Sequence, residues 1–215
     1  KLNKHNILNI SRDYIGLTKP KVISLLLITA ITGMFLANGR TPSIILIVII
    51  IVGGALASGG AGAINHFIDK DVDKLMKRTS NRPVASNRVT GKKALLFGIT
   101  LTILSFIVLY FGSNFLTALL AIAGNMFYVF IYSLWLKKTT SHNIVIGGIA
   151  GCFPPLVGWA AVTGTLSLPA WYLFAIIFFW TPPHFWALAM LMNEDYKKAK
   201  IPMLPTIIGF QKTQI

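Results

Sequence analysis

Three side chains with oxygen donors recur at every fourth position near the start of a long polar segment. They are Asn65, Asp69 and Asp73, and we call them the Asn/Asp stripe because residues four apart lie on one face of a continuous helix. Mg²⁺ usually takes one or two carboxylates, together with waters and the phosphates of a substrate. The Asn/Asp stripe therefore predicts a magnesium site that is shared with a phosphate-bearing ligand.

Asp71, which lies between the two carboxylates of the stripe, falls on the opposite side of the helix. Lys70 and Lys74 can neutralise it there. The alternative interpretation of the whole segment is a solvated helix end with exposed ion pairs. That alternative does not explain why the Asn/Asp stripe directly continues a Gly-rich apolar segment, where acidic groups at the edge of a membrane indicate function.

Two arginines follow the stripe closely. Arg78 and Arg82 lie just beyond Asp73, and the planar fork of arginine matches the geometry of phosphate oxygens. Either arginine alone is typical of an anchor at the membrane surface. Beside a predicted magnesium site, the pair indicates a diphosphate ligand.

The composition predicts that a lipid bilayer surrounds the elements that position these residues. Of the 215 residues, 54% are hydrophobic and only 12% are charged, whereas a soluble domain carries roughly twice that charged fraction. Apolar runs of about 20 residues suit helices that cross a bilayer, inside which the backbone must be satisfied within each segment. We therefore expect an all-α, polytopic transmembrane helix bundle that forms a single domain over residues 1–215. The expected spans are about 22–38, 43–67, 94–112, 115–136, 144–163 and 170–192.

The basic residues set the expected orientation. Among the Lys and Arg residues, only Arg40 lies in a joint on the opposite side of the membrane from the others. By the positive-inside rule, both ends of the sequence are expected to face the cytoplasm. All six Asp and Glu residues fall on that same side. The net charge of +14 then reflects membrane orientation, and no nucleic-acid partner is expected.

Small residues crowd two of the expected spans, at 58–63 and 147–151. In lipid, small side chains let helix backbones approach closely. The same stretches could also make room for a bulky ligand, and the sequence leaves both alternatives open. The single cysteine, Cys152, follows the second stretch, so we expect neither an internal disulfide nor a cysteine metal cluster.

Several stretches resemble those of a known family. The Asn/Asp stripe, together with Met76–Thr79 and Arg82–Pro83, is similar to the first aspartate-rich motif of the UbiA-type intramembrane prenyltransferases. Further stretches are similar to the branch of that family that farnesylates haem, namely Thr18–Val22, Tyr132–Lys138, Gly151–Pro155, Trp180–Ala187, Asp195–Tyr196 and Ile201–Pro205. Relatives that prenylate aromatic acids carry a second aspartate motif where this sequence has only Asn193–Tyr196.

The resemblance implies transfer of the farnesyl group of farnesyl diphosphate to a vinyl group of haem B, giving haem O and diphosphate, with Mg²⁺ as cofactor. It also implies about nine spans, so we expect this sequence to be a piece of a longer chain. The expected location is a bacterial plasma (inner) membrane. Haem A synthase or a terminal oxidase assembly is the expected protein partner.

The resemblance also implies roles for individual residues. Asn65, Asp69 and Asp73 are expected to hold Mg²⁺ and diphosphate, and Arg78 and Arg82 to stabilise charge on the leaving oxygens. The expected substrate-binding residues are Lys137, Lys138, His184, Trp186, Asp195, Tyr196, Lys19 and Lys21.

Some of these residues have a simpler alternative. Lys19 and Lys21 could be membrane anchors rather than ligands of a phosphate or a haem propionate. His184 could bond to a neighbouring helix rather than contact haem iron, and His66 is a further candidate for substrate contact. For the whole chain, the rival functions are a UbiA-type enzyme acting on an aromatic quinone precursor and a non-enzymatic haem-handling or transport membrane protein.

Overall fold

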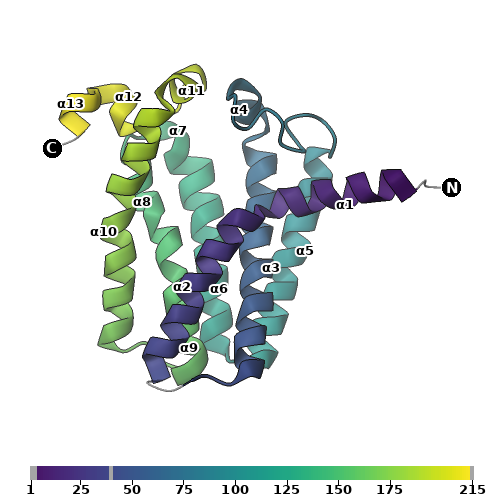
Figure 1. Cartoon of the computed structure of the whole chain (residues 1–215), viewed down its shortest axis with the longest axis vertical. Coiled ribbons are helices and arrows are strands. Elements are labelled where there is room, and N and C mark those ends of the chain that lie inside the picture. Colours follow the sequence, from purple (N-terminus) through teal and green to yellow (C-terminus); the bar gives the residue numbers. More distant parts are fainter. Residues whose placement is uncertain (1–3, 39–40, 214–215) are drawn as a thin grey trace.

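The computed structural model describes residues 4–38 and 41–213. Across these two ranges the chain forms helices and turns and contains no strand, which confirms the expected all-α class. Six helical segments are long and apolar enough to cross a membrane, and Figure 1 shows them as an upright bundle. Lys1 and Arg40, which belong to the predicted charge distribution, lie outside the described residues.

The six spans are built from α-helices with two local exceptions. Their elements are α2 (Pro20–Asn38), α3 (Ile44–Ile68), α5 (Gly91–Gly112), α6 (Phe115–Met126) continued by η1 (Phe127–Leu136) and α7 (Lys137–Thr139), α8 (Asn143–Gly147) continued by η2 (Gly148–Cys152) and α9 (Phe153–Thr163), and α10 (Leu168–Leu191). Each span begins and ends within three residues of the range expected from the sequence. η1 is a π-helix and η2 is a 3-10 helix, and the sequence predicted neither.

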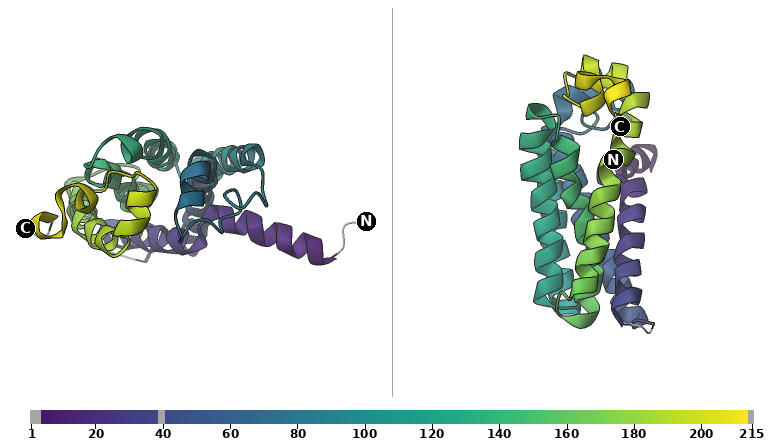
Figure 2. Two further views of the ribbon diagram at one scale, coloured as in Figure 1. Left: turned by 90° about the horizontal axis from the view of Figure 1, so that it is seen from above. Right: turned by 90° about the vertical axis from the view of Figure 1, so that its left-hand side faces the viewer.

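One end of the bundle carries most of the structure outside the spans, and we call it the capped end. Its elements are α1 (Lys4–Thr18), α4 (Lys70–Leu75), α11 (Asn193–Lys198), α12 (Leu204–Ile208) and α13 (Phe210–Thr213). α1 runs across the direction of the spans and extends outward from the bundle (Figures 1 and 2). At the opposite end, residues 113–114 and 164–167 are short joints between spans. The acidic residues and the described basic residues all belong to segments at the capped end.

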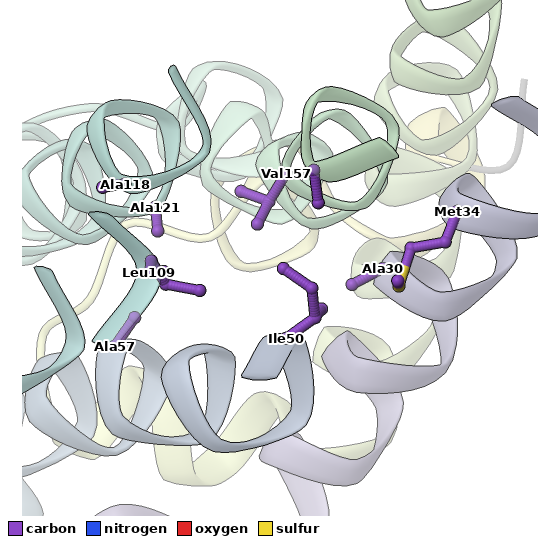
Figure 3. Close-up of a cluster of buried hydrophobic side chains, with 9 residues drawn as sticks. Ala30, Met34, Ile50, Ala57, Leu109, Ala118, Ala121 and Val157 are labelled. Carbon is purple, nitrogen blue, oxygen red and sulfur yellow. The ribbon is translucent and has the colours of Figure 1, made fainter. Parts of the chain in front are cut away.

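A cluster of buried apolar side chains packs the spans together, mostly in the half of the bundle farther from the capped end. Ala30 and Met34 of α2 share it with Ile50 of α3, Leu109 of α5 and Val157 of α9 (Figure 3). The outer faces of the spans carry many exposed Leu, Ile and Phe side chains. Such faces are suited to lipid, which is as apolar as the side chains themselves.

Glycine allows two pairs of spans to approach closely. A Cβ atom on Gly158 of α9 would collide with the backbone of Ala30 in α2. A Cβ atom on Gly98 of α5 would lie 2.8 Å from the carbonyl oxygen of Gly60 in α3. Residues 59–63 are all buried, so the first stretch of small residues serves helix packing, which was one of the two alternatives.

Gly158→Ala should destabilise the bundle, because the added methyl group meets backbone atoms that cannot move aside. Overpacking of this kind costs about 1–3 kcal/mol of folding free energy. Gly151→Ala is the matched control, since the atom nearest to its new Cβ would be Ile177 Cγ2 at 4.0 Å. The midpoint of thermal unfolding in detergent should fall for Gly158→Ala alone. Equal midpoints for the two variants would contradict the close contact between α2 and α9.

Candidate functional site

The Asn/Asp stripe lies where α3 ends at the capped end of the bundle. The spacing of the stripe predicted a continuous helix at this point. Instead, α3 ends at Ile68, and Asp69 adopts φ −91° and ψ 5° before α4 begins. The helical hydrogen bonds nevertheless continue: Asp69 N–H donates to Asn65 O at 2.9 Å, and Asp73 N–H donates to Asp69 O at 2.8 Å. The stripe is therefore kept across the break. Asn65, Asp69 and Asp73 are 2%, 0% and 2% exposed.

Each carboxylate of the stripe is paired with a cation from another segment. Lys137, at the start of α7, pairs through Nζ with Asp69 Oδ2. Arg82, in the loop after α4, places Nη1 2.9 Å from both carboxylate oxygens of Asp73. A buried carboxylate without such a partner would be costly, so these two pairs allow the stripe to be buried.

Lys19 enters the same site from the joint between α1 and α2. Its backbone φ is 58°, in the left-handed region that residues other than glycine rarely adopt. Its Nζ donates to Asn65 Oδ1 at 2.6 Å and to the Tyr128 hydroxyl at 3.3 Å. Burial, followed by the positive charges of Arg82 and Lys137, lowers the pKa of Lys19 from 10.5 to about 7. Lys19 thus contacts the stripe and does not only anchor the chain at the membrane surface.

Asn65 connects the stripe to the fourth span through η1. Its Nδ2 donates to Asp69 Oδ2 at 2.8 Å and to Ser133 Oγ at 3.0 Å. Ser133 and Tyr128 are five positions apart, so on an α-helix they would point about 140° apart. The i→i+5 bonding of a π-helix brings such residues nearer to one face. Neither residue is among the site members predicted from the sequence, because an α-helix was expected at this point.

One carboxylate oxygen of the stripe has no hydrogen-bond partner in the part of the chain that the structure describes. Asp69 Oδ1 is buried and accepts no hydrogen bond from any residue between 4 and 38 or 41 and 213. Both ring nitrogens of the neighbouring His66 are also buried and unbonded within that part of the chain. Buried polar atoms of this kind are expected to meet an ion, a ligand or a water. An unpaired carboxylate oxygen within an oxygen-only set fits a hard divalent cation such as Mg²⁺.

Several predicted site residues lie outside the buried cluster of charges around the Asn/Asp stripe. Lys21, Lys138 and Arg78 are exposed. The backbone N–H of Arg78 lies 3.4 Å from Asp195 Oδ2, which joins the loop after α4 to α11. Tyr196, also on α11, packs against a buried apolar cluster at the capped end. The structure therefore places α11 beside the loop that carries the arginines.

His184 and Trp186 lie on α10, and no hydrogen bond among the described residues links them to the Asn/Asp stripe. The His184 ring stacks on Trp180 with 4.3 Å between the ring centroids. Trp186 Nε1 is buried without a partner in the described part of the chain. Pro182 and Pro183 lie inside α10 and lack N–H donors, which leaves carbonyl groups one turn earlier unbonded within the helix.

The fold and the site define a class of protein: a polytopic α-helical bundle that buries an Asn/Asp stripe among lysines and an arginine at one end of its spans. The sequence matches the model of the UbiA prenyltransferase family over residues 26–215. The chain belongs to this family and is an integral membrane protein.

Three curated relatives share one name. The chain is 54% identical over 204 residues to the Protoheme IX farnesyltransferase of Thermus thermophilus, which is 95% of this chain and 34% of the relative. For Deinococcus radiodurans the identity is 53%, over 94% of this chain and 66% of the relative. For Mycobacterium avium the identity is 56%, over 90% of this chain and 63% of the relative. The chain thus spans from about a third to about two thirds of the length of these relatives.

Solved structures share the fold at low sequence identity. A UbiA homolog from Archaeoglobus fulgidus bound to DMAPP and Mg²⁺ matches with a TM-score of 0.78 and 20% identity, over 94% of this chain and 71% of that chain. A structure of digeranylgeranylglyceryl phosphate synthase matches with a TM-score of 0.75 and 21% identity, over 94% of this chain and 70% of that chain. These likenesses establish the fold alone.

Lys137→Met should destabilise the protein, because it leaves the fully buried carboxylate of Asp69 without its cation. Removing one partner of a buried ion pair costs about 3–5 kcal/mol. Lys74→Met is the control: it breaks a pair with Asp71 in which the side chains are 46% and 76% exposed and 3.7 Å apart, and such pairs contribute about 0–1 kcal/mol. Thermal unfolding in Mg²⁺-free detergent solution measures both. Equal losses would contradict a role for Lys137 in stabilising the buried carboxylate.

Proposed function

We propose that the chain binds a prenyl diphosphate together with Mg²⁺ at the Asn/Asp stripe and transfers a farnesyl group to a vinyl group of haem B. With addition of water, the products are haem O and diphosphate. The observation that carries the proposal is the burial of the stripe among Lys19, Arg82 and Lys137 in a member of the UbiA prenyltransferase family. The names of the curated relatives support the choice of farnesyl donor and haem acceptor.

The charges of the site support a magnesium–diphosphate ligand. Asn65, Asp69 and Asp73 would hold the ion, which acts as a Lewis acid towards phosphate oxygens when bound. Two carboxylates and three cations give the cluster a formal charge of +1 when all are ionised. The cations would then remain as donors to the phosphate oxygens, for which guanidinium and ammonium groups are well suited.

The difficult step is the breaking of the C–O bond of an allylic diphosphate, because negative charge gathers on the leaving oxygens. Lys19, Arg82 and Lys137 are held in place by their bonds to the stripe, so they are preorganised to stabilise that charge. The vinyl carbon of haem B attacks the farnesyl carbon as the diphosphate leaves. Water then captures the resulting cation and a proton is lost.

The aromatic rings of η1 support a role in protecting a developing carbocation. Tyr128 faces a cation already, since Lys19 Nζ lies 5.8 Å from the centroid of its ring, within the range of cation–π attraction. The ring of Tyr132 lies 5.5 Å from that of Tyr128. We assign these rings to the farnesyl side of the site.

For the acceptor, we assign the porphyrin to the side of α10. His184 is stacked on Trp180 within that span, and histidine is a common ligand of haem iron. Trp186 would supply a further contact. Exposed Lys21 and Lys138 at the capped end would suit the haem propionates.

The proposal includes the orientation of the chain. The described basic residues gather at the capped end, which supports a cytoplasmic location for that end under the positive-inside rule. We place the protein in a bacterial plasma (inner) membrane with both described ends in the cytoplasm. Haem A synthase or a terminal oxidase assembly is the proposed recipient of the product.

Asp69→Asn should lower Mg²⁺-dependent release of diphosphate from farnesyl diphosphate by about 10²–10³-fold. The change keeps the size of the side chain but removes one negative charge from the oxygen set that would hold the ion. Asp71→Asn is the matched control, because Asp71 is exposed on the far side from the stripe. Diphosphate release by membranes that contain each variant, supplied with haem B, measures the difference. Similar rates for the two variants would remove Asp69 from the magnesium site.

A comparison of acceptors tests the reaction itself. Membranes containing the chain are given labelled farnesyl diphosphate with either haem B or an aromatic acid, and we expect label in haem alone. Label in the aromatic acid alone would overturn the haem assignment in favour of an enzyme that prenylates a quinone precursor. Absence of diphosphate release with either acceptor would favour a non-enzymatic haem-handling or transport protein.

A further inference from the structure

Arg88 lies outside the Asn/Asp stripe, at the point where α1 meets the loop between α4 and α5. Its Nε donates to Asp13 Oδ1 of α1 at 2.9 Å. Within the loop, Nη1 donates to Ser86 Oγ at 2.7 Å and Nη2 to the carbonyl oxygen of Asn81 at 2.9 Å. All three nitrogens of the guanidinium group thus donate a hydrogen bond, each to a different residue.

The loop that Arg88 holds is the loop that carries Arg82. The Oγ of Ser86 donates to the carbonyl oxygen of Arg82 at 2.8 Å, and the backbone N–H of Ser86 donates to the same oxygen at 2.9 Å. Arg82 in turn places Nη1 2.9 Å from both carboxylate oxygens of Asp73. An unbroken series of hydrogen bonds therefore runs from Arg88 to the stripe.

The other partner of this guanidinium group, Asp13, lies on the helix that leads to Lys19. α1 ends at the residue before Lys19, so the placement of the helix fixes where the Lys19 side chain begins. Leu17 of α1 is fully buried in a cluster with Val84 and Val89 of the loop. α1 and the loop therefore pack as one unit, and the ion pair at Asp13 fixes the register between them.

We infer that Arg88 is a positioning residue for the diphosphate site, an inference that rests on the proposed function. By joining α1 to the loop, it fixes Lys19 and Arg82, two of the three cations of the site, relative to each other. Isolated exposed ion pairs contribute little to stability. The guanidinium group of Arg88, however, donates to three residues at once, so it restricts where those residues lie relative to one another. Lysine could not replace it, because a single ammonium group lacks the planar fork.

The test compares the affinity of the full chain, in lipid nanodiscs, for magnesium farnesyl diphosphate across a set of variants. Arg88→Ala removes the whole network, Asp13→Ala removes only the link to α1, and Asp13→Arg combined with Arg88→Asp restores that link with the charges exchanged. Lys74→Ala is the matched control, since the Lys74 and Arg88 side chains are both 46% exposed and each pairs with an aspartate. The midpoint of thermal unfolding is measured for each variant.

We expect Arg88→Ala and Asp13→Ala to weaken binding and to raise KM for farnesyl diphosphate by about tenfold or more, as displaced positioning groups do. The exchanged pair should recover part of the affinity, and Lys74→Ala should bind like the parent. If Arg88→Ala does not fold, Asp13→Ala decides, because it keeps the bonds to Ser86 and Asn81.

Parental affinity in Asp13→Ala, or in a folded Arg88→Ala, would overturn the inference. So would a loss of affinity that only follows a loss of thermal stability and is not recovered in the exchanged pair. Failure of the unmodified chain to bind magnesium farnesyl diphosphate is a different result. It would overturn the proposed function, and the inference with it.

Discussion

Two carboxylates buried at the end of a membrane-spanning helix need counter-charges, and the capped end is arranged around that need. Asp69 and Asp73 are almost fully buried, and a lone buried charge is strongly destabilising. The cations that face the Asn/Asp stripe come from three separate segments: the joint before α2, the loop after α4 and the end of the fourth span. These segments must therefore assemble together, and they bring α1, the loop and η1 to one place.

The packing of the spans supports the charged groups around the Asn/Asp stripe. Glycine contacts hold α2 against α9 and α3 against α5, and the buried apolar cluster links all four of these helices. A charged site needs such support, because its groups stabilise a developing charge only when they are already in position. Asp69 and Asp73 are themselves shielded from water, which strengthens the electrostatic interactions that they make.

The spans and the stripe could be predicted from the sequence because their signals are local. The apolar runs that form the spans can be read directly from the composition. The spacing of the Asn/Asp stripe predicts a shared face correctly, because the helical hydrogen bonds continue across the break at Asp69. Tyr128 and Ser133 were missed because spacing by five has no meaning on an α-helix. Arg88 and Asp13 were missed because their contact joins positions 75 residues apart, and a pairing between distant polar residues leaves no pattern in either segment.

The π-helix η1 makes the length of its segment matter as much as its composition. It contains ten residues, and its i→i+5 bonds close a turn with one residue more than an α-helix uses. A chain that lost one residue between Phe127 and Leu136 would turn the part after the deletion relative to the part before it, because the segment would no longer hold the residues that its present turns use. Lys137 would then leave Asp69 while Tyr128 stayed beside Lys19. Deletions and insertions of single codons should therefore be tolerated less in this segment than in surface loops.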